Sequence, residues 1–541
     1  MWNPTSIEQQ FSRNIKPLFL DGLCPERENQ SVLIAETVNR TPHIETSLEI
    51  ALRLAFAGFH VVYLHYGKYL LENDFYNSVG TGLVSWFKRK GISYEQNGIS
   101  ILEAIKEKYN LPITVLNASY YLFSGACSEK YSIEGLNVAC PETLQSLKNL
   151  DWKGSRQIGM SVLSALVSRA KSAEFNYLDC KTDAIRLIRD YQFSYLITQK
   201  VVNELKNVGA FIVFNGRFPA GKSVCQLASE KHAPVFYHER TSNLFKFSLR
   251  SYQVHDRISL QKDMVDTWNA ISSRNSVDNS AIAAQYFRDL RAGKDLGWVS
   301  FSSNYSSGLA LDLVSKVKTA SGFSQVVCFF ASSDDEYASV DDVFVRERSD
   351  WDNQRQMLKA VVTACSEASI ALIVRVHPRL AKINSPDQVV WDELQFIDSD
   401  KSHVLVVPSN SSVSSYELID DVDAVITCNS TVGIEAVFWG KPSIVLSENF
   451  YDNIGASIYK ARSHERLRML LSGLNDLDVD PRSALPYGFF WASNGEQFCL
   501  YKPSGLSTGK FLGINMSASC ITPWGKTVLF LVHFFRRLIS R

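Results

Sequence analysis

The stretch from Val422 to Leu446, VDAVITCNSTVGIEAVFWGKPSIVL, constrains the fold more than any other part of the chain. The short apolar run Asp423–Thr427 is typical of a strand buried on both faces. A helix is predicted over about Val432–Trp439, ending at Gly440, and a second strand over Ser443–Leu446. Strand, helix and strand in this order predict a βαβ unit and therefore a parallel sheet.

Three small polar residues, Asn429, Ser430 and Thr431, stand between the first strand and the helix. Ligands of open α/β sheets bind at the carboxyl ends of the strands, and a helix N-terminus there favours a phosphate. Glu435 follows about one turn later and suits ribose hydroxyls as a hydrogen-bond acceptor. The alternatives are that Ser430 and Thr431 only cap the helix and that Glu435 lies on a solvated face.

The same pattern recurs through the second half of the chain. Strands are predicted at 325–330, 371–376 and 404–407. Two of them are followed by polar residues, namely Ser332, Ser333, His377, Pro378 and Arg379. In a parallel sheet these loops open on one edge, where hydroxyls, an imidazole and a guanidinium suit a nucleotide phosphate. The alternatives are an ordinary polar turn for the serines, turn capping for His377 and a surface charge for Arg379.

The first half of the chain shows a similar order of strand, loop and helix, with strands predicted at 31–35, 60–64, 210–214 and 235–237. Two α/β units with polar strand ends imply a cleft between facing domains. Candidate residues for the second substrate are His43, Glu45, Asn215, Gly216, Arg217 and Glu239. Glu239 and Glu45 are candidates for a base or nucleophile and His43 for a base. Asn215, Gly216 and Arg217 are candidates for sugar binding. The alternatives are salt-bridged loop residues and an ordinary turn.

A chain of 541 residues is too long for one ordinary core, so two large domains are expected. We predict a lead-in over 1–28, an N-terminal domain over 29–280 with an insertion at about 66–180, a C-terminal domain over 281–480 and a final segment over 481–541. That segment ends in an apolar run, 528–535, beside Arg536, Arg537 and Arg541. The run is expected to be an interfacial membrane helix or a terminal helix packed on the body.

Composition excludes several classes of function. With 56 basic and 56 acidic residues the formal net charge is +0, which argues against nucleic acid as a partner. The 10 cysteines form no C-x-x-C pair, so free thiols in a reducing compartment are expected. Without a signal peptide or an apolar run of ~20 residues, the chain is expected in the cytoplasm. The acidic run 334–336 lacks partner ligands, so no metal site is predicted.

Five segments resemble a known family. They are FFASSDDEY (329–337), VRVHPR (374–379), SSYELIDDVDAVITCNSTVGIEAVFWGKPSIV (414–445), FNGRF (214–218) and YHER (237–240). Together they resemble bacterial glycosyltransferases of capsule and surface-polysaccharide synthesis of the GT-B type. The resemblance implies two facing Rossmann-like domains, with the nucleotide sugar on the second and the acceptor on the first. It also implies that His377, Pro378, Ser430 and Thr431 hold the nucleotide phosphate and Glu435 a ribose.

The donor stays open, because similar families use CMP-linked sugars such as Kdo or UDP-linked sugars. The opening stretch also resembles CDP-glycerol polymerases and, more distantly, UDP-GlcNAc 2-epimerases. We therefore predict a cytoplasmic glycosyltransferase that needs no cofactor beyond its nucleotide-sugar substrate. Its acceptor would be a capsule, O-antigen or similar polysaccharide, or a lipid-linked precursor at the inner membrane surface. The alternatives are a UDP-sugar epimerase and a non-catalytic protein of polysaccharide binding or export assembly.

Overall fold

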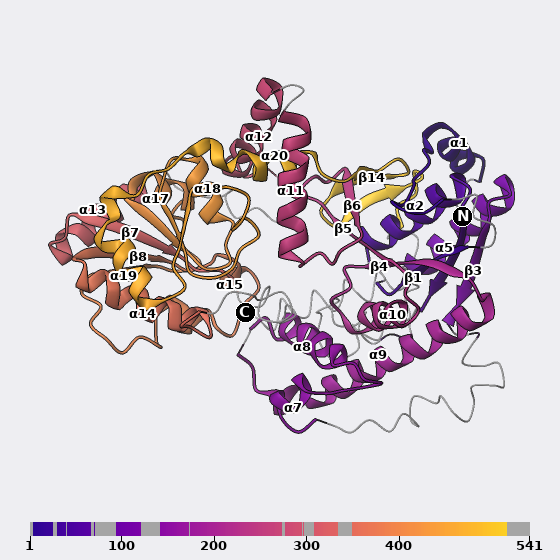
Figure 1. Cartoon of the computed structure of the whole chain (residues 1–541), viewed down its shortest axis with the longest axis horizontal. Coiled ribbons are helices and arrows are strands. Elements are labelled where there is room, and N and C mark those ends of the chain that lie inside the picture. The colour runs from indigo at the N-terminus through magenta and orange to yellow at the C-terminus, as the bar shows by residue number, and fades with distance from the viewer. Residues whose placement is uncertain are drawn as a thin grey trace, which may run out of the picture. The chain divides into compact units, whose positions relative to one another are not determined.

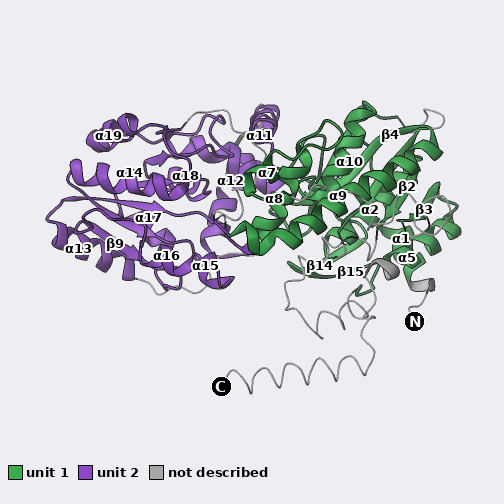
Figure 2. Cartoon of the chain, turned by 90° about the horizontal axis from the view of Figure 1, so that it is seen from below, with its two compact units in different colours: residues 1–169, 176–254, 495–541 green, residues 170–175, 255–494 purple. Residues whose placement is uncertain are grey.

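The computed structural model describes residues 4–24, 30–38, 40–66, 70, 94–118, 120, 141–172, 174–272, 276–294, 296, 308–333 and 349–516. The chain divides into two compact units (Figure 2). Unit 1 comprises 1–169, 176–254 and 495–541, and unit 2 comprises 170–175 and 255–494. The sequence analysis predicted the boundaries of the C-terminal domain near residues 280 and 480. Helix α11 (Arg257–Ser272) falls in unit 2 because it packs against helix α20 (Leu485–Ser493).

Unit 1 is built on a seven-stranded sheet of order β13-β6-β5-β4-β1-β2-β3 (Figure 1). Strands β1 to β5 are parallel, whereas β6 and β13 run antiparallel to their neighbours. The strands are β1 Ser31–Glu36, β2 His60–His65, β3 Ile113–Asn117, β4 Val208–Phe214, β5 Val235–Arg240, β6 Lys246–Arg250 and β13 Glu496–Gln497. The helices are α1 Pro4–Asn14, α2 His43–Phe56, α5 Tyr94–Tyr109, α7 Leu144–Lys148, α8 Gln157–Ala170, α9 Tyr177–Leu205 and α10 Pro219–Glu230.

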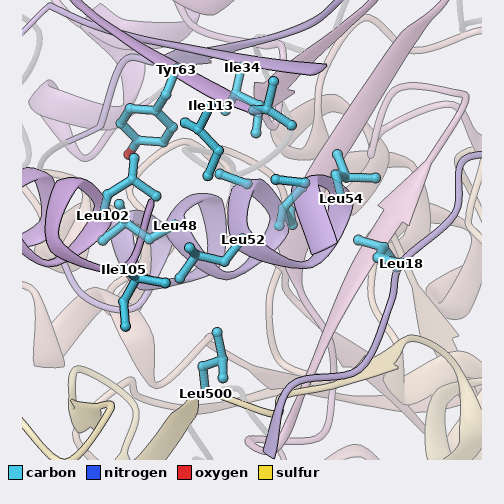
Figure 3. Packing of buried hydrophobic residues seen from close by; sticks show 14 of the residues in the cluster. Leu18, Ile34, Leu48, Leu52, Leu54, Tyr63, Leu102, Ile105, Ile113 and Leu500 are labelled. Atoms are coloured by element: carbon cyan, nitrogen blue, oxygen red, sulfur yellow. The ribbon is translucent and has the colours of Figure 1, made fainter. Parts of the chain in front are cut away.

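The core of unit 1 forms because its central strands are apolar on both faces. Alternate residues of β1 enter two separate clusters, for example Ile34 in one and Leu33 in the other. Figure 3 shows helix α2 with Ile34 on one side and Leu500 on the other. Leu500 precedes a hairpin of β14 (Tyr501–Gly505) and β15 (Thr508–Phe511). Buried Glu49 of α2 accepts the backbone N–H groups of residues 499–501 and so fixes this returning segment.

Two element boundaries in unit 1 differ from the sequence prediction and change the setting of candidate residues. Helix α2 begins at His43, so His43 and Glu45 lie in its first turn and not in a loop. Strand β5 continues to Arg240, so Glu239 lies within a strand. The reason is that antiparallel β6 pairs with Tyr237 to Arg240 and extends β5 past the end of β4.

Unit 2 contains a six-stranded, wholly parallel sheet of order β12-β11-β10-β7-β8-β9. The strands are β7 Gln325–Phe330, β8 Ile370–Arg375, β9 Val404–Val407, β10 Ala424–Thr427, β11 Ser443–Val445 and β12 Ile458–Lys460. The helices are α11, α12 Ser276–Arg291, α13 Leu309–Ser321, α14 Gln354–Glu367, α15 Arg379–Lys382, α16 Gln388–Asp392, α17 Ser415–Asp421, α18 Val432–Phe438, α19 His464–Ser472 and α20, with 3-10 helices at Leu474–Asp476 and Pro481–Ala484.

The helices of unit 2 cover both faces of the sheet. Val327 and Phe329 of β7 belong to one cluster with residues of α14 and α19. Val326 and Cys328 belong to the other, with residues of α13 and α17. Both faces of the strand are therefore buried, which explains its continuous apolar sequence.

The predicted fold class is confirmed, since both units are α/β with a mainly parallel sheet. The arrangement of the units as two domains facing a cleft stays a prediction. The acidic run 334–336, the terminal run 528–535 and much of the insertion at 66–180 lie outside the described residues. Among the helices that the structure describes, none has the length and apolar character needed to cross a bilayer.

Candidate functional site

The predicted donor residues of unit 2 lie at one edge of its sheet. Phe330 of β7 pairs with Arg375 of β8 and with Thr427 of β10, so these three strands end at the same level. The loops that follow carry Ser332 and Ser333, then His377 to Arg379, then Ser430 and Thr431. The structure therefore brings all three loops to the carboxyl edge, as the parallel topology predicted.

The start of helix α18 is held by hydroxyl groups. Oγ of Ser430 accepts the N–H of Val432, the first residue of the helix, at 3.3 Å. The hydroxyl of Thr431 makes no capping bond and instead donates to Oε1 of Glu435 at 2.7 Å. The backbone carbonyl of Ser430 accepts the hydroxyl of Tyr451 at 2.6 Å. Within the described chain, no acceptor contacts the backbone N–H of Ser430 or Thr431.

Glu435 is not on a solvated helix face, because only 6% of it is exposed. Thr431 donates to Oε1, and the hydroxyl of Tyr416 donates to Oε2. Burial raises the pKa of Glu435, and the hydrogen bonds from Tyr416 and Thr431 lower it. A carboxylate oxygen accepts more than one hydrogen bond, so a ribose hydroxyl would share these oxygens with Tyr416 and Thr431.

His377 and Pro378 form the turn that leads from β8 into α15. Nδ1 of His377 accepts the backbone N–H of Arg379 at 3.1 Å, which confirms the turn-capping interpretation. Because Nδ1 accepts, the neutral ring carries its proton on Nε2, which is therefore a donor. Pro378, with φ −60, precedes the first residue of the short helix. His377, Pro378 and Arg379 are all half-buried.

The two serines after β7 are buried. The backbone N–H of Ser332 donates to Oε1 of Gln354 at 2.7 Å, and Nε2 of Gln354 donates to the Ser332 carbonyl at 3.2 Å. Gln354 therefore fixes this loop against helix α14. Oγ of Ser332 has no hydrogen-bond partner among the described residues, although the atom is buried.

The structure adds one cation that the sequence did not indicate. Arg257, at the start of α11, donates from Nη2 to Oδ1 of Asn429 at 3.1 Å. It therefore touches the residue before Ser430. No local signal in the sequence marks Arg257, because its contact with Asn429 spans 172 positions.

In unit 1 the structure brings Glu239, Asn215 and His43 together. Nδ2 of Asn215 donates to Oε2 of Glu239 at 2.7 Å, and the N–H of Arg240 donates to Oε1 at 2.9 Å. Nδ1 of His43 lies 3.9 Å from Oε1 of Glu239. Asn215 has a positive φ of 54°, a conformation that asparagine adopts more readily than most other residues do.

His43 is neutral in this cluster. Burial lowers the pKa of His43 well below its usual value, and the charges of Arg40 and Arg240 and the proximity of His238 add to this effect. Its ring also packs against that of Phe214, with centroids 4.0 Å apart. The contact with Glu239 is therefore no ion pair at neutral pH, and His43 is a weak base there.

Gly216 and Arg217 follow Asn215 in the chain, but they contact residues other than Glu239. Gly216 has φ +74°, and a Cβ there would overlap the ring of Tyr237. Nη2 of Arg217 donates to Oγ of Ser168 in α8 at 3.1 Å, and the guanidinium lies 4.6 Å from the Phe218 ring centroid. Arg217 therefore joins the β4–α10 turn to helix α8.

Glu45 is 0% exposed, which separates it from a substrate. Thr41 donates to Oε1 at 2.7 Å, and Oε2 has no donor among the described residues. Glu45 stands one turn before Glu49 and shares its helix face, which lies against residues 499–501. Burial raises the pKa of Glu45 from an ordinary 4.5 to about 7.

The raised pKa of Glu45 predicts a dependence of stability on pH. Since the folded-state pKa lies above the unfolded value, this contribution is fully present below about pH 4.5 and is lost as pH rises through about 7. The shift corresponds to about 3 kcal/mol of unfolding free energy. The pKa of Glu49 is also raised to about 7, so both carboxyl groups lower the unfolding free energy as pH rises. Glu45→Gln is expected to remove about half of this combined fall.

Urea unfolding of the wild type and of Glu45→Gln at pH 4.5 and pH 8 measures this loss of unfolding free energy. The substituted amide still offers Thr41 an acceptor oxygen. An equal fall in unfolding free energy for both proteins would contradict the prediction.

Residues 338–468 match the family model described as "Capsule polysaccharide biosynthesis protein". Protein FixF of Sinorhizobium fredii is 31% identical over 119 residues, which cover 22% of this chain and 26% of FixF. The chain thus spans about a quarter of that curated relative.

Solved structures give lower similarity. The beta Kdo 2,4 transferase of Thermosulfurimonas dismutans KpsC is 14% identical, with a TM-score of 0.33, over 52% of this chain and 79% of that one. The beta Kdo 2,7 transferase of the same organism's KpsC is 16% identical, with a TM-score of 0.30, over 56% and 88%. MurG of Acinetobacter baumannii is 11% identical, with a TM-score of 0.22, over 86% and 94%.

The matched segment, 338–468, includes His377, Ser430, Thr431 and Glu435. Residues 338–468 are therefore similar to the capsule polysaccharide biosynthesis proteins, which confirms the family resemblance predicted from the sequence.

Proposed function

We propose that the protein is a glycosyltransferase that moves a sugar from a nucleotide-sugar donor to a surface polysaccharide or its lipid-linked precursor. One observation carries the proposal. The capsule-biosynthesis segment coincides with the sheet edge that gathers His377, Ser430, Thr431 and Glu435. Their donors and carboxylate suit a nucleotide, with its phosphate toward the N–H groups and Nε2 of His377 and its ribose toward Glu435.

The remaining donor candidates have supporting roles in this proposal. Pro378 sets the turn that orients His377, and Arg379 supplies the N–H that fixes its tautomer. Ser332 and Ser333 would line the phosphate side of the edge. Helix α18 has only seven residues, so its dipole alone is a weak source of binding energy. The hydrogen-bond donors around it would contribute most of the affinity.

Glu239 is the proposed base or nucleophile of unit 1. As a base it would take the proton of the acceptor hydroxyl while the acceptor oxygen attacks the anomeric carbon and the bond to the phosphate breaks. The hydrogen bonds from Asn215 and Arg240 orient its carboxylate. Glu45 is less suited to this role because it is fully buried. His43 is less suited because its pKa is lowered, which makes it a weak base.

A nucleotide screen tests the donor site. The folded protein is heated with CMP, CDP, UDP, GDP or ADP, and a nucleotide that binds only the folded state raises the midpoint of unfolding. One nucleotide is expected to give a clear shift. His377→Ala is expected to weaken its binding about tenfold or more. His464→Ala, which changes an exposed histidine of the same unit, serves as the control.

Three outcomes separate this proposal from its alternatives. Sugar transfer to a glycan or glycolipid acceptor, with release of the nucleotide, supports it. Conversion of a UDP-sugar without any acceptor supports an epimerase. No shift with any of the five nucleotides at millimolar concentration contradicts both enzymes and favours a non-catalytic role. Binding at the inner membrane surface, proposed from the terminal run 528–535, is measured separately by flotation with anionic vesicles.

A further inference from the structure

We propose that Arg257 is a phosphate-binding residue of the donor site. The inference rests on the function proposed above and adds a residue from α11, which lies before the family segment in the chain. Arg257 would supply the positive charge that the turn before α18 lacks. The bound group is the phosphate of a nucleotide, in its free form or as part of a nucleotide sugar.

The first argument is position. Nη2 of Arg257 donates to Oδ1 of Asn429 at 3.1 Å. Asn429 directly precedes Ser430 and Thr431, and its own N–H donates to Oγ of Ser447 at 2.8 Å. The guanidinium is therefore held against the turn that presents the N–H groups of Ser430 and Thr431.

The second argument is preorganisation. One turn after Arg257, Nε2 of Gln261 donates to the carbonyl of Asn449 at 2.9 Å, and Oε1 of Gln261 accepts the N–H of Asn453 at 2.8 Å. These bonds fix α11 on the loop that follows β11. The guanidinium of Arg257 also lies 5.5 Å from the ring centroid of Phe450 in this loop. Its side chain is thus positioned before a ligand arrives, which reduces the entropy lost on binding.

The third argument is charge. The side chain of Arg257 is 8% exposed, so water and salt screen the charge of its guanidinium only weakly. Oε2 of Glu448 lies 3.6 Å from Nη1 and forms an ion pair with the guanidinium. A phosphate beside Asn429 would offer a planar guanidinium two acceptor oxygens at once. Glu448 would then compete with the phosphate for the same cation.

The test compares ligands that differ only in phosphate. The affinities of cytidine and CMP, and of uridine and UDP, are measured by calorimetry for the wild type, Arg257→Gln, Arg257→Lys and Glu448→Gln. Lys262→Gln is the matched control, because Lys262 lies on the same helix, is exposed and pairs with Asp266. Unfolding midpoints of all variants show whether each is folded.

Arg257→Gln is expected to weaken binding of the nucleotide roughly ten- to a hundredfold and to change binding of the nucleoside less than about twofold. The nucleotide affinity of Arg257→Lys is expected to lie between those of Arg257→Gln and the wild type. The ammonium group of lysine keeps the positive charge, but it cannot donate two parallel hydrogen bonds to a phosphate as a guanidinium does. Glu448→Gln, which keeps the arginine, is expected to bind the nucleotide at least as tightly as the wild type.

Three results would overturn the inference alone. The first is unchanged nucleotide binding by Arg257→Gln, and the second is an equal loss of nucleoside and nucleotide binding in this variant, which indicates a structural role. The third is a loss of nucleotide affinity in Glu448→Gln as large as the loss in Arg257→Gln. A wild-type protein that binds none of the five nucleotides CMP, CDP, UDP, GDP and ADP would overturn the proposed function itself, and the inference with it.

Discussion

Replacing Glu239 by glutamine is expected to lower the rate of sugar transfer about a hundred- to ten-thousandfold, the range for loss of a general base. Glutamine keeps the size of the side chain and leaves an acceptor for Asn215, but it cannot take a proton. Glu239 is also the carboxylate that the structure surrounds with Asn215, Arg240 and His43. Initial rates with saturating donor and acceptor measure the loss.

Two controls make this result specific. Glu103→Gln removes a carboxylate of α5 that pairs with Lys106 near the surface, and it is expected to keep the wild-type rate. Nucleotide affinity is expected to be unchanged in Glu239→Gln, because the proposed donor residues belong to unit 2. A rate within a factor of three of the wild type would assign Glu239 a structural role and remove it from the mechanism.

Replacing Gly433 by alanine is expected to destabilise the fold by about 1–3 kcal/mol, the usual cost of overpacking. Gly433 lies in α18 where the helix contacts the sheet. A Cβ there would overlap the hydroxyl of Tyr451 and lie 2.9 Å from Oγ1 of Thr427 and 3.0 Å from Oγ of Ser443. The displaced Tyr451 hydroxyl would lose its bond to the Ser430 carbonyl, so nucleotide binding should weaken as well.

Chemical unfolding of Gly433→Ala and of two companion variants checks this prediction. Gly221→Ala in α10 is the control, because the nearest atom to its Cβ would be the Phe214 carbonyl oxygen at 3.4 Å, an ordinary contact. That variant is expected to be neutral or slightly stabilising, since alanine favours helix more than glycine does. Adding Tyr451→Phe to Gly433→Ala is expected to recover part of the lost stability. Equal stability of Gly433→Ala and the wild type would contradict the steric argument.

The sequence predicted the second sheet well because its information there is local. Strands that are buried on both faces, such as β7 and β8, are continuous apolar runs. The residues after them are polar, and parallel pairing alone brings Ser332, His377 and Ser430 to one edge. The hydrogen bond from Val432 to the Ser430 hydroxyl and the turn-capping role of His377 also follow from residue type and position.

The prediction was less complete where distant segments decide the setting of a residue. A solvated helix face was one alternative for Glu435, but the side chain is buried and accepts a hydrogen bond from Tyr416, 19 positions away. Glu45 looked like a loop residue, but it begins the buried face of α2 that meets residues 499–501. Strand β5 reaches Glu239 only because β6 pairs with its end.

By itself, therefore, the sequence determined the α/β class, the parallel strands and the polar edge of unit 2. It did so because the spacing of apolar residues specifies which faces of an element are buried. The tertiary structure alone decided which element covers each face. It placed Arg257 beside Asn429 and returned residues 495–516 to unit 1, through contacts that span 172 and about 450 positions. Such contacts depend on the packing of the whole unit, which no local pattern of residues encodes.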